Sequence, residues 1–165
     1  MHERLPRSPE GHEFIHDPSP RPYLRANPRL DAKTSNYGPS DADYDIDILD
    51  IRQPDDSWDF IICHRIIEHV PDDHRAMREL FRVLKPGGRL IMSVPIGFDQ
   101  SKTIEYGVPN PHESMHFYSY GTDFPQRIPA EFEVTRYVFS DMFSRADFAS
   151  MSLFEDWVFV CRKLG

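Results

Sequence analysis

The sequence contains no long hydrophobic run, and this argues against a membrane-spanning helix. Such a helix needs about 18 or more consecutive apolar residues, and the 165 residues of this chain include no such stretch. The first residues, MHERLPRSPEGHE, also lack the apolar centre of a secretion signal. We therefore expect a cytoplasmic protein with no membrane partner.

Cysteine and positive charge are also scarce. The two cysteines, Cys63 and Cys161, each lie inside an apolar run, so we expect two buried reduced thiols. Lysine and arginine number 19 against 27 acidic residues, which gives a net charge of −8. Because binding to a nucleic-acid backbone depends on a basic surface, this balance argues against a nucleic acid as the main partner.

Glycine is rare in the first half of the chain, whereas proline is frequent. Of eight glycines only Gly11 and Gly38 precede residue 87, and the 15 prolines cluster before residue 40 and between 95 and 129. The length predicts one domain over residues 1–165. We expect residues 1–12 to be flexible and residues 97–129 to be an irregular segment.

The clearest pattern is a strand, a helix and a second strand. DFIICH (59–64) and RLIMSVPI (89–96) are short apolar runs, which are typical of strands covered on both faces. Between them, Pro71 and Asp72 supply a helix start, and apolar residues follow at helical spacing. The stretch KPGG (85–88) then ends the helix. This order predicts a right-handed crossover between parallel strands.

Weaker patterns predict the remaining elements. Two earlier strands should flank a short helix, an acid-rich alternating stretch should form a strand or a strand end, and two β-prone segments should form a terminal pair. In chain order these are FIH (14–16), the helix at 20–27, LDAKTSNY (30–37), YDIDILDI (44–51), EFEVTRYVFS (131–140) and DWVFVCRKL (156–164).

The stretch DIDILDIRQPDDSWDFIICHRIIEHVPDDHRAMRELFRVLKPGGRLIMSVPI (45–96) resembles one enzyme family. It is similar to the class I S-adenosylmethionine-dependent methyltransferases of the small-molecule, type 11 kind. An acid, a turn, S-W-D, E-H-V and L-K-P-G-G occur in the order and at the spacing of that family. The resemblance implies a three-layer α/β fold of the Rossmann-like methyltransferase type. Its sheet should be mostly parallel with an antiparallel last strand.

The resemblance also implies where S-adenosylmethionine would bind. Asp47 and Ile48 match the pair that meets the adenine, through a carboxylate and a backbone N–H. Cys63, His64 and Arg65 leave the carboxyl end of a strand, beside the methionine part of the cofactor. Glu68 and His69 are interpreted as structural residues of the turn that follows.

Methyl transfer is an in-line displacement that needs positioning and sometimes a general base. His64 and His116 are the candidate catalytic residues, because the pKa of histidine lies near neutrality. The segment PHESMHFYSYGTDF (111–124) resembles the region that covers the acceptor pocket in the family. It supplies the predicted substrate-binding residues, which are His112, His116, Tyr118, Tyr120 and Asp123. A surface loop with an aromatic plug is an equal alternative.

A metal site is not predicted. His112 and His116 have the i, i+4 spacing of a zinc helix, but Pro109 and Pro111 oppose a helix there. We therefore expect S-adenosylmethionine alone as cofactor.

The first cofactor loop departs from the family, which normally has an acid followed by glycines after its first strand. EFIHDPSP (13–20) has Asp17 as the acid and prolines in place of the glycines. Asn36 takes the place of the acid that binds the ribose. Two functions therefore stay open: methyl transfer to a small-molecule substrate, or a non-catalytic methyltransferase-like partner with weakened cofactor binding. A homodimer or a partner subunit that completes the site is part of this prediction.

Overall fold

The computed structural model describes residues 31–38, 41–97, 99–138 and 154–165. By its internal contacts the chain divides into two units, residues 1–47 and residues 48–165, and each is described by itself. The predicted elements at 14–16 and 20–27, and the cofactor residue Asp17, lie outside the described residues. The prediction of a single domain stays a prediction.

The first unit contains a short parallel pair, β1 (Ser35–Asn36) and β2 (Tyr44–Asp45). We expected longer strands at 30–37 and 44–51. The carboxylate of Asp43 accepts hydrogen bonds from the Thr34 backbone N–H and hydroxyl at 2.7 and 2.9 Å, and Asp45 accepts one from the Gly38 N–H at 2.7 Å. Acidic side chains thus take up N–H groups that a longer ladder would use.

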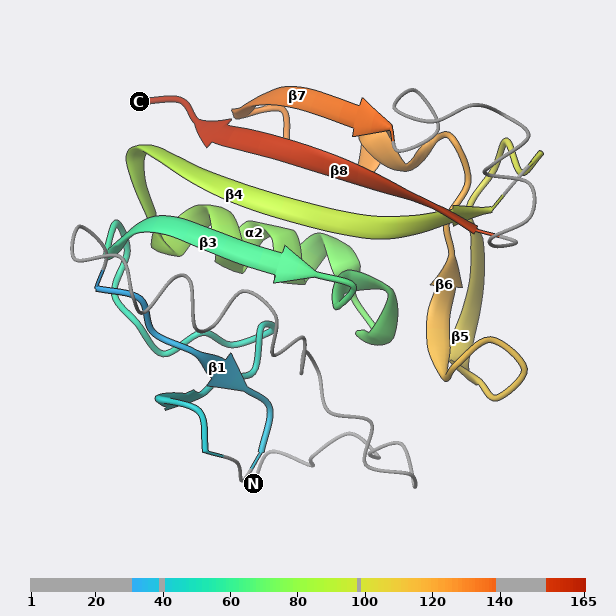
Figure 1. Ribbon diagram of the computed structural model, residues 1–165, viewed down its shortest axis with the longest axis horizontal. Helices are drawn as coiled ribbons and strands as arrows, with labels where there is room; N and C mark the ends of the chain where they lie inside the picture. Colours follow the sequence, from blue (N-terminus) through green and yellow to red (C-terminus); the bar gives the residue numbers. More distant parts are fainter. Residues whose placement is uncertain (1–30, 39–40, 98, 139–153) are drawn as a thin grey trace. The chain divides into compact units, whose positions relative to one another are not determined.

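The second unit is built on a four-stranded sheet in the order β3-β4-β8-β7 (Figure 1). The strands are β3 (Trp58–His64), β4 (Leu84–Gly97), β7 (Phe132–Val138) and β8 (Phe154–Lys163). β3 and β4 run parallel, and β8 is antiparallel to both of its neighbours. The predicted parallel pairing of the two strands and the antiparallel last strand are confirmed.

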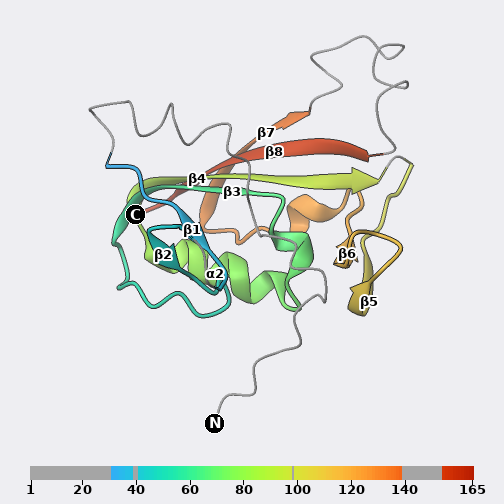
Figure 2. The same ribbon diagram turned by 60° about the horizontal axis from the view of Figure 1, so that its bottom comes forward.

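The crossover between β3 and β4 passes through α2 (Asp73–Val83), which packs against the sheet (Figures 1 and 2). The Asp72 carboxylate caps the helix by accepting a hydrogen bond from the Arg75 N–H at 2.8 Å. Ala76, Met77 and Leu80 are buried along its inner face. In the first residues of β4, a Cβ on Gly88 would lie 2.8 Å from the Lys85 carbonyl oxygen, so glycine is required there.

The segment 97–129 contains more regular structure than we expected. An antiparallel pair, β5 (Ile104–Asn110) and β6 (His116–Ser119), is followed by the short 3-10 helix η2 (Phe124–Arg127). The register of the pair shifts between Glu105 and Asn110, and Gly107 within this interval has a φ of 71°. Such an irregularity breaks the period-two pattern from which a strand is predicted.

Candidate functional site

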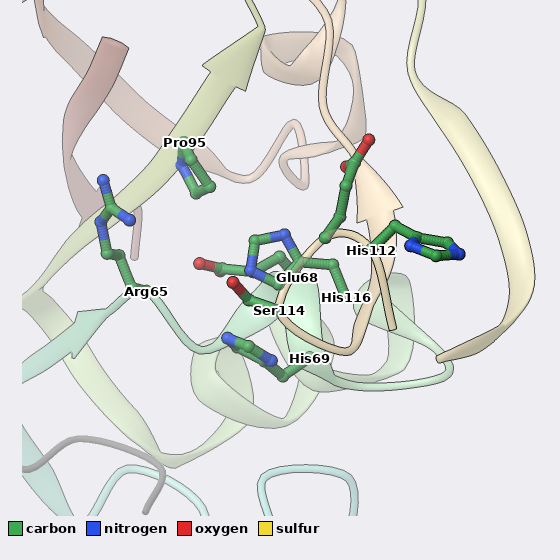
Figure 3. Close-up of a pocket in the computed structure, with 8 residues that line it drawn as sticks. Arg65, Glu68, His69, Pro95, His112, Ser114 and His116 are labelled. Atoms are coloured by element: carbon green, nitrogen blue, oxygen red, sulfur yellow. The ribbon is translucent and has the colours of Figure 1, made fainter. Parts of the chain in front are cut away.

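A pocket of about 420 Å³ lies at the carboxyl ends of β3 and β4, beside the β5–β6 connection (Figure 3). Ligands of open α/β sheets bind at this edge. Seven of its eight lining residues have polar or charged side chains, and three of these are histidines. Its lining residues are Arg65, Glu68, His69, Pro95, His112, Glu113, Ser114 and His116.

Arg65 directs the chain out of β3 and into the pocket wall. Its φ of 49° lies in the left-handed region, and its N–H donates to the Ser93 carbonyl at 3.0 Å. Its guanidinium forms a two-pronged ion pair with Asp156 of β8, with N···O distances of 2.6 and 3.1 Å. The positive charge of Arg65 is therefore largely balanced within the protein.

Glu68 lies in the 3-10 helix η1 (Ile67–His69) and is completely buried. Neither of its carboxylate oxygens has a hydrogen-bond partner in the described part of the chain. Burial raises the pKa of Glu68 to about 8, and the nearby positive charge of Arg65 offsets only part of this effect. A buried acid without a partner is unusual, because such groups are normally satisfied.

Two histidines meet in the pocket next to Glu68. The rings of His69 and His116 contact edge to face, with centroids 4.5 Å apart. Burial lowers the pKa of His116, Glu113 opposes this effect and Arg65 adds to it. Figure 3 shows Glu68, His69, Ser114 and His116 together at the centre of the pocket, while His112 lies to one side.

A tight turn carries His112 and Glu113 to the pocket. The side chain of Asn110 accepts a hydrogen bond from the His112 N–H at 3.0 Å, and its carbonyl accepts from Glu113 and Met115 at 3.1 and 2.9 Å. The backbone of Ser114 and Met115 has positive φ, at 51° and 62°. This turn therefore fixes the side of the pocket opposite β3.

The structure brings three of the predicted site residues of the second unit together in this pocket: Arg65, His112 and His116. His64 lies outside the lining, and its Nδ1 forms a hydrogen bond with the Ser93 hydroxyl. Cys63 is buried, and burial raises the pKa of its thiol. Ile48, at the start of this unit, is half-buried.

Tyr118, Tyr120 and Asp123 were predicted to bind the substrate, but none of them lines the pocket. The Tyr118 hydroxyl donates to the Pro71 carbonyl at 2.9 Å, and Tyr120 donates to Asp73 at 3.1 Å. Burial raises the pKa of both phenols. Burial acts to raise the pKa of Asp123, but the hydrogen bonds from Thr103 act more strongly in the opposite direction. The pKa of Asp123 therefore lies below its usual value.

In the first unit, the side-chain oxygen of Asn36 is buried and has no hydrogen-bond donor among the residues that the structure describes. Such an acceptor fits a hydroxyl group of a ligand. Asp47 ends this unit and is half-buried.

Sequence reasoning missed Glu68 and His69 as pocket residues, and it did not include Glu113 and Ser114. The pair E-H was visible in the sequence and was given a structural role. Its proximity to His116 depends on how β6 packs beside η1, and no local spacing records that contact.

Comparison with known proteins gives one family. Residues 15–92 match the family model described as a methyltransferase domain. Over 39 residues the chain is 49% identical to the ubiquinone/menaquinone biosynthesis C-methyltransferase UbiE of Vibrio vulnificus. This stretch covers 24% of this chain and 15% of that protein. Over 74 residues the chain is 32% identical to a probable S-adenosylmethionine-dependent methyltransferase of Mycolicibacterium smegmatis. This stretch covers 44% of this chain and 24% of that protein.

The fold is likewise similar to solved structures. The [4+2]-cyclase SpnF gives a TM-score of 0.55 at 17% identity, over 74% of this chain and 56% of that one. The phosphoethanolamine N-methyltransferase 2 of Haemonchus contortus, solved with S-adenosylhomocysteine, gives a TM-score of 0.52 at 14% identity. That match covers 73% of this chain and 37% of the other chain. These values support the α/β Rossmann-like fold. The matched segments span at most a quarter of the two curated relatives.

No helix in the described ranges is both long enough and apolar enough to span a membrane.

Proposed function

We propose that this chain, which by its sequence match belongs to the class I S-adenosylmethionine-dependent methyltransferases, transfers a methyl group to a small-molecule acceptor. The observation that carries this proposal is the pocket at the carboxyl ends of β3 and β4. A volume of about 420 Å³ lies within the usual range for small-molecule sites. Several polar groups point into it, as the binding of a polar acceptor requires.

The cofactor residues follow from the resemblance and from the buried groups. We propose Asn36 as an acceptor for a ribose hydroxyl, which its unpaired oxygen supports. Asp47 and Ile48 are proposed to meet the adenine. Cys63, His64 and Arg65 are proposed to bind the methionine part, with the backbone of the first two as the contact, because both side chains are engaged or buried.

The bound cofactor supplies an activated methyl group, and the residues of the pocket position the acceptor in line with it. Of the two predicted bases, only His116 lines the pocket, so it is the one that reaches an acceptor there. Its lowered pKa keeps the imidazole neutral near pH 7, and a neutral imidazole can accept a proton.

Thermal melting with S-adenosylhomocysteine tests the proposal. Ligand at about 100 times its dissociation constant should stabilise the folded chain by about 2.7 kcal/mol, because it binds only the folded state. Adenosine at the same concentration is the control for a general nucleoside effect. No shift at millimolar S-adenosylhomocysteine would contradict the enzyme proposal and support the non-catalytic alternative.

Replacing Asp47 by alanine should weaken the binding of S-adenosylhomocysteine by at least about 10-fold, since a hydrogen bond to a charged group contributes about 1.5–3 kcal/mol. Isothermal titration would measure this change. Asp50→Ala is a matched control, because Asp50 is an exposed acid in the same acid-rich stretch. Equal affinities of the two variants would mean that the adenine does not bind at Asp47.

A further inference from the structure

Glu68 is the least satisfied polar side chain in the pocket. It is 0% exposed, and both carboxylate oxygens lack a hydrogen-bond donor in the described residues. A buried carboxyl group in this state loses its hydration without compensation. Buried charges in proteins are normally paired with a cation or coordinate a metal ion. The position therefore calls for a partner that the neighbouring side chains do not provide.

Two possible nitrogen ligands lie close to Glu68. One ligand atom each from Glu68, His69 and His116 lies within 4.8 Å of the other two. A tetrahedral zinc ion with bonds of about 2.1 Å separates its ligands by about 3.4 Å. Binding of an ion would therefore draw the three ligand atoms closer to a common centre, and Figure 3 shows all three side chains at the centre of the pocket.

The charge around the three residues also favours a cation. Glu113 lines the same pocket, and its carboxylate acts electrostatically on His116. The opposing charge is Arg65, whose guanidinium is held by Asp156 at 2.6 and 3.1 Å. Two carboxyl groups, those of Glu68 and Glu113, therefore lie in a pocket whose one arginine already has its own counter-ion.

We propose that Glu68, His69 and His116 form a binding site for one divalent transition-metal ion of the zinc type. Two imidazoles and one carboxylate suit zinc and its neighbours in the first transition series. Calcium and magnesium prefer oxygen ligands throughout and fit this set poorly. Three protein ligands leave at least one coordination position open toward the pocket.

The open position gives the site a use that rests on the proposed methyl transfer. A hydroxyl or thiol of an acceptor coordinated there would have a lowered pKa, so it would give its proton to solvent water near neutral pH. The resulting oxygen or sulfur anion would then take the methyl group from the cofactor, which would leave as S-adenosylhomocysteine. Coordination occupies the lone pair that His116 would need as a base. The ion would then activate the acceptor in place of His116. The acceptors would be compounds that carry a metal-binding oxygen or sulfur atom.

Zinc titration of the full chain, without a histidine tag and after stripping with a chelator, tests the site in the absence of any cofactor. Competition with a chromophoric chelator should show one Zn²⁺ per chain. Cobalt as a replacement should give the intense visible absorption of a low-coordinate ion. Glu68→Gln and His116→Asn should each weaken zinc binding at least about 100-fold, since even outer-shell changes cost 10- to 100-fold.

The control variants separate this site from general histidine binding. His112→Asn removes a histidine that lines the pocket outside the cluster, and His74→Asn removes an exposed histidine of α2. Both should bind zinc within about twofold of the wild-type affinity. Circular dichroism confirms folding, and if Glu68→Gln does not fold, His116→Asn carries the test.

The proposal is overturned if the wild-type chain binds no stoichiometric zinc. It is equally overturned if the Glu68 and His116 variants bind zinc as tightly as the two controls. Because no cofactor is present in this titration, its failure leaves the melting test with S-adenosylhomocysteine unaffected. If the chain binds zinc but its melting temperature does not shift with S-adenosylhomocysteine, the metal site is supported and the methyl-transfer proposal is wrong.

Discussion

Arg127→Met should lower the free energy of unfolding by about 3–5 kcal/mol, because it leaves a buried carboxylate without its counter-charge. The guanidinium of Arg127 binds Asp73 through two hydrogen bonds of 2.6 and 2.9 Å. The side chain of Asp73 is 1% exposed and that of Arg127 is 15% exposed. Water therefore has little access to replace the lost partner.

This ion pair joins two parts of the second unit that are distant in sequence. Asp73 is the first residue of α2, and Arg127 is the last residue of η2. Tyr120 donates a further hydrogen bond to Asp73 at 3.1 Å, and Glu105 of β5 pairs with the other side of Arg127 at 2.9 Å. The pair thus holds the helix start against the segment that carries His116.

Urea denaturation of Arg127→Met should show a lower midpoint with an unchanged slope. Arg162→Met is the control, because Arg162 pairs with Glu133 on the surface, where both side chains are about half exposed. That variant should cost about 0–1 kcal/mol. Adding Asp73→Asn to Arg127→Met should recover part of the loss. The interpretation is wrong if the two arginine variants have the same midpoint.

The sequence was sufficient for the centre of the fold because its signals there are local. The isoleucine-rich run at 59–64, the Asp72 cap and the glycines at 87–88 act on neighbouring residues, and the structure contains β3, α2 and β4 there. The terminal pair β7 and β8 was also predicted from its β-branched and aromatic residues. These elements could be found without knowing what packs against them.

The pocket could be predicted only in part, because it depends on contacts between distant segments. The family resemblance indicated the edge of the sheet where Arg65 lies, and also the loop with His112 and His116. The role of Glu68 was not visible, because its burial and its missing partner are properties of the folded chain. Tyr118 and Tyr120 were expected at the acceptor, but their hydroxyls bind Pro71 and Asp73 instead.

The tyrosines belong to an aromatic cluster that supports the pocket segment. Tyr118 and Tyr120 stack with their ring centroids 5.5 Å apart, and Tyr120 meets Phe124 edge to face at 4.5 Å. Phe124 continues to Phe159 of β8 at 5.3 Å. Phe124 and Phe159 are both 0% exposed. The cluster therefore connects β6 and η2 with the central sheet.

Phe124→Ala should lower the free energy of unfolding by about 3–5 kcal/mol, because the removed ring leaves a cavity between aromatic side chains that cannot collapse into it. Urea denaturation followed by circular dichroism would measure the loss. Phe60→Ala is the matched control, since Phe60 of β3 is 40% exposed, and it should cost only about 1 kcal/mol. Phe124→Leu should fall between the two. Similar midpoints for Phe124→Ala and Phe60→Ala would show that the pocket segment is not held to the sheet through this ring.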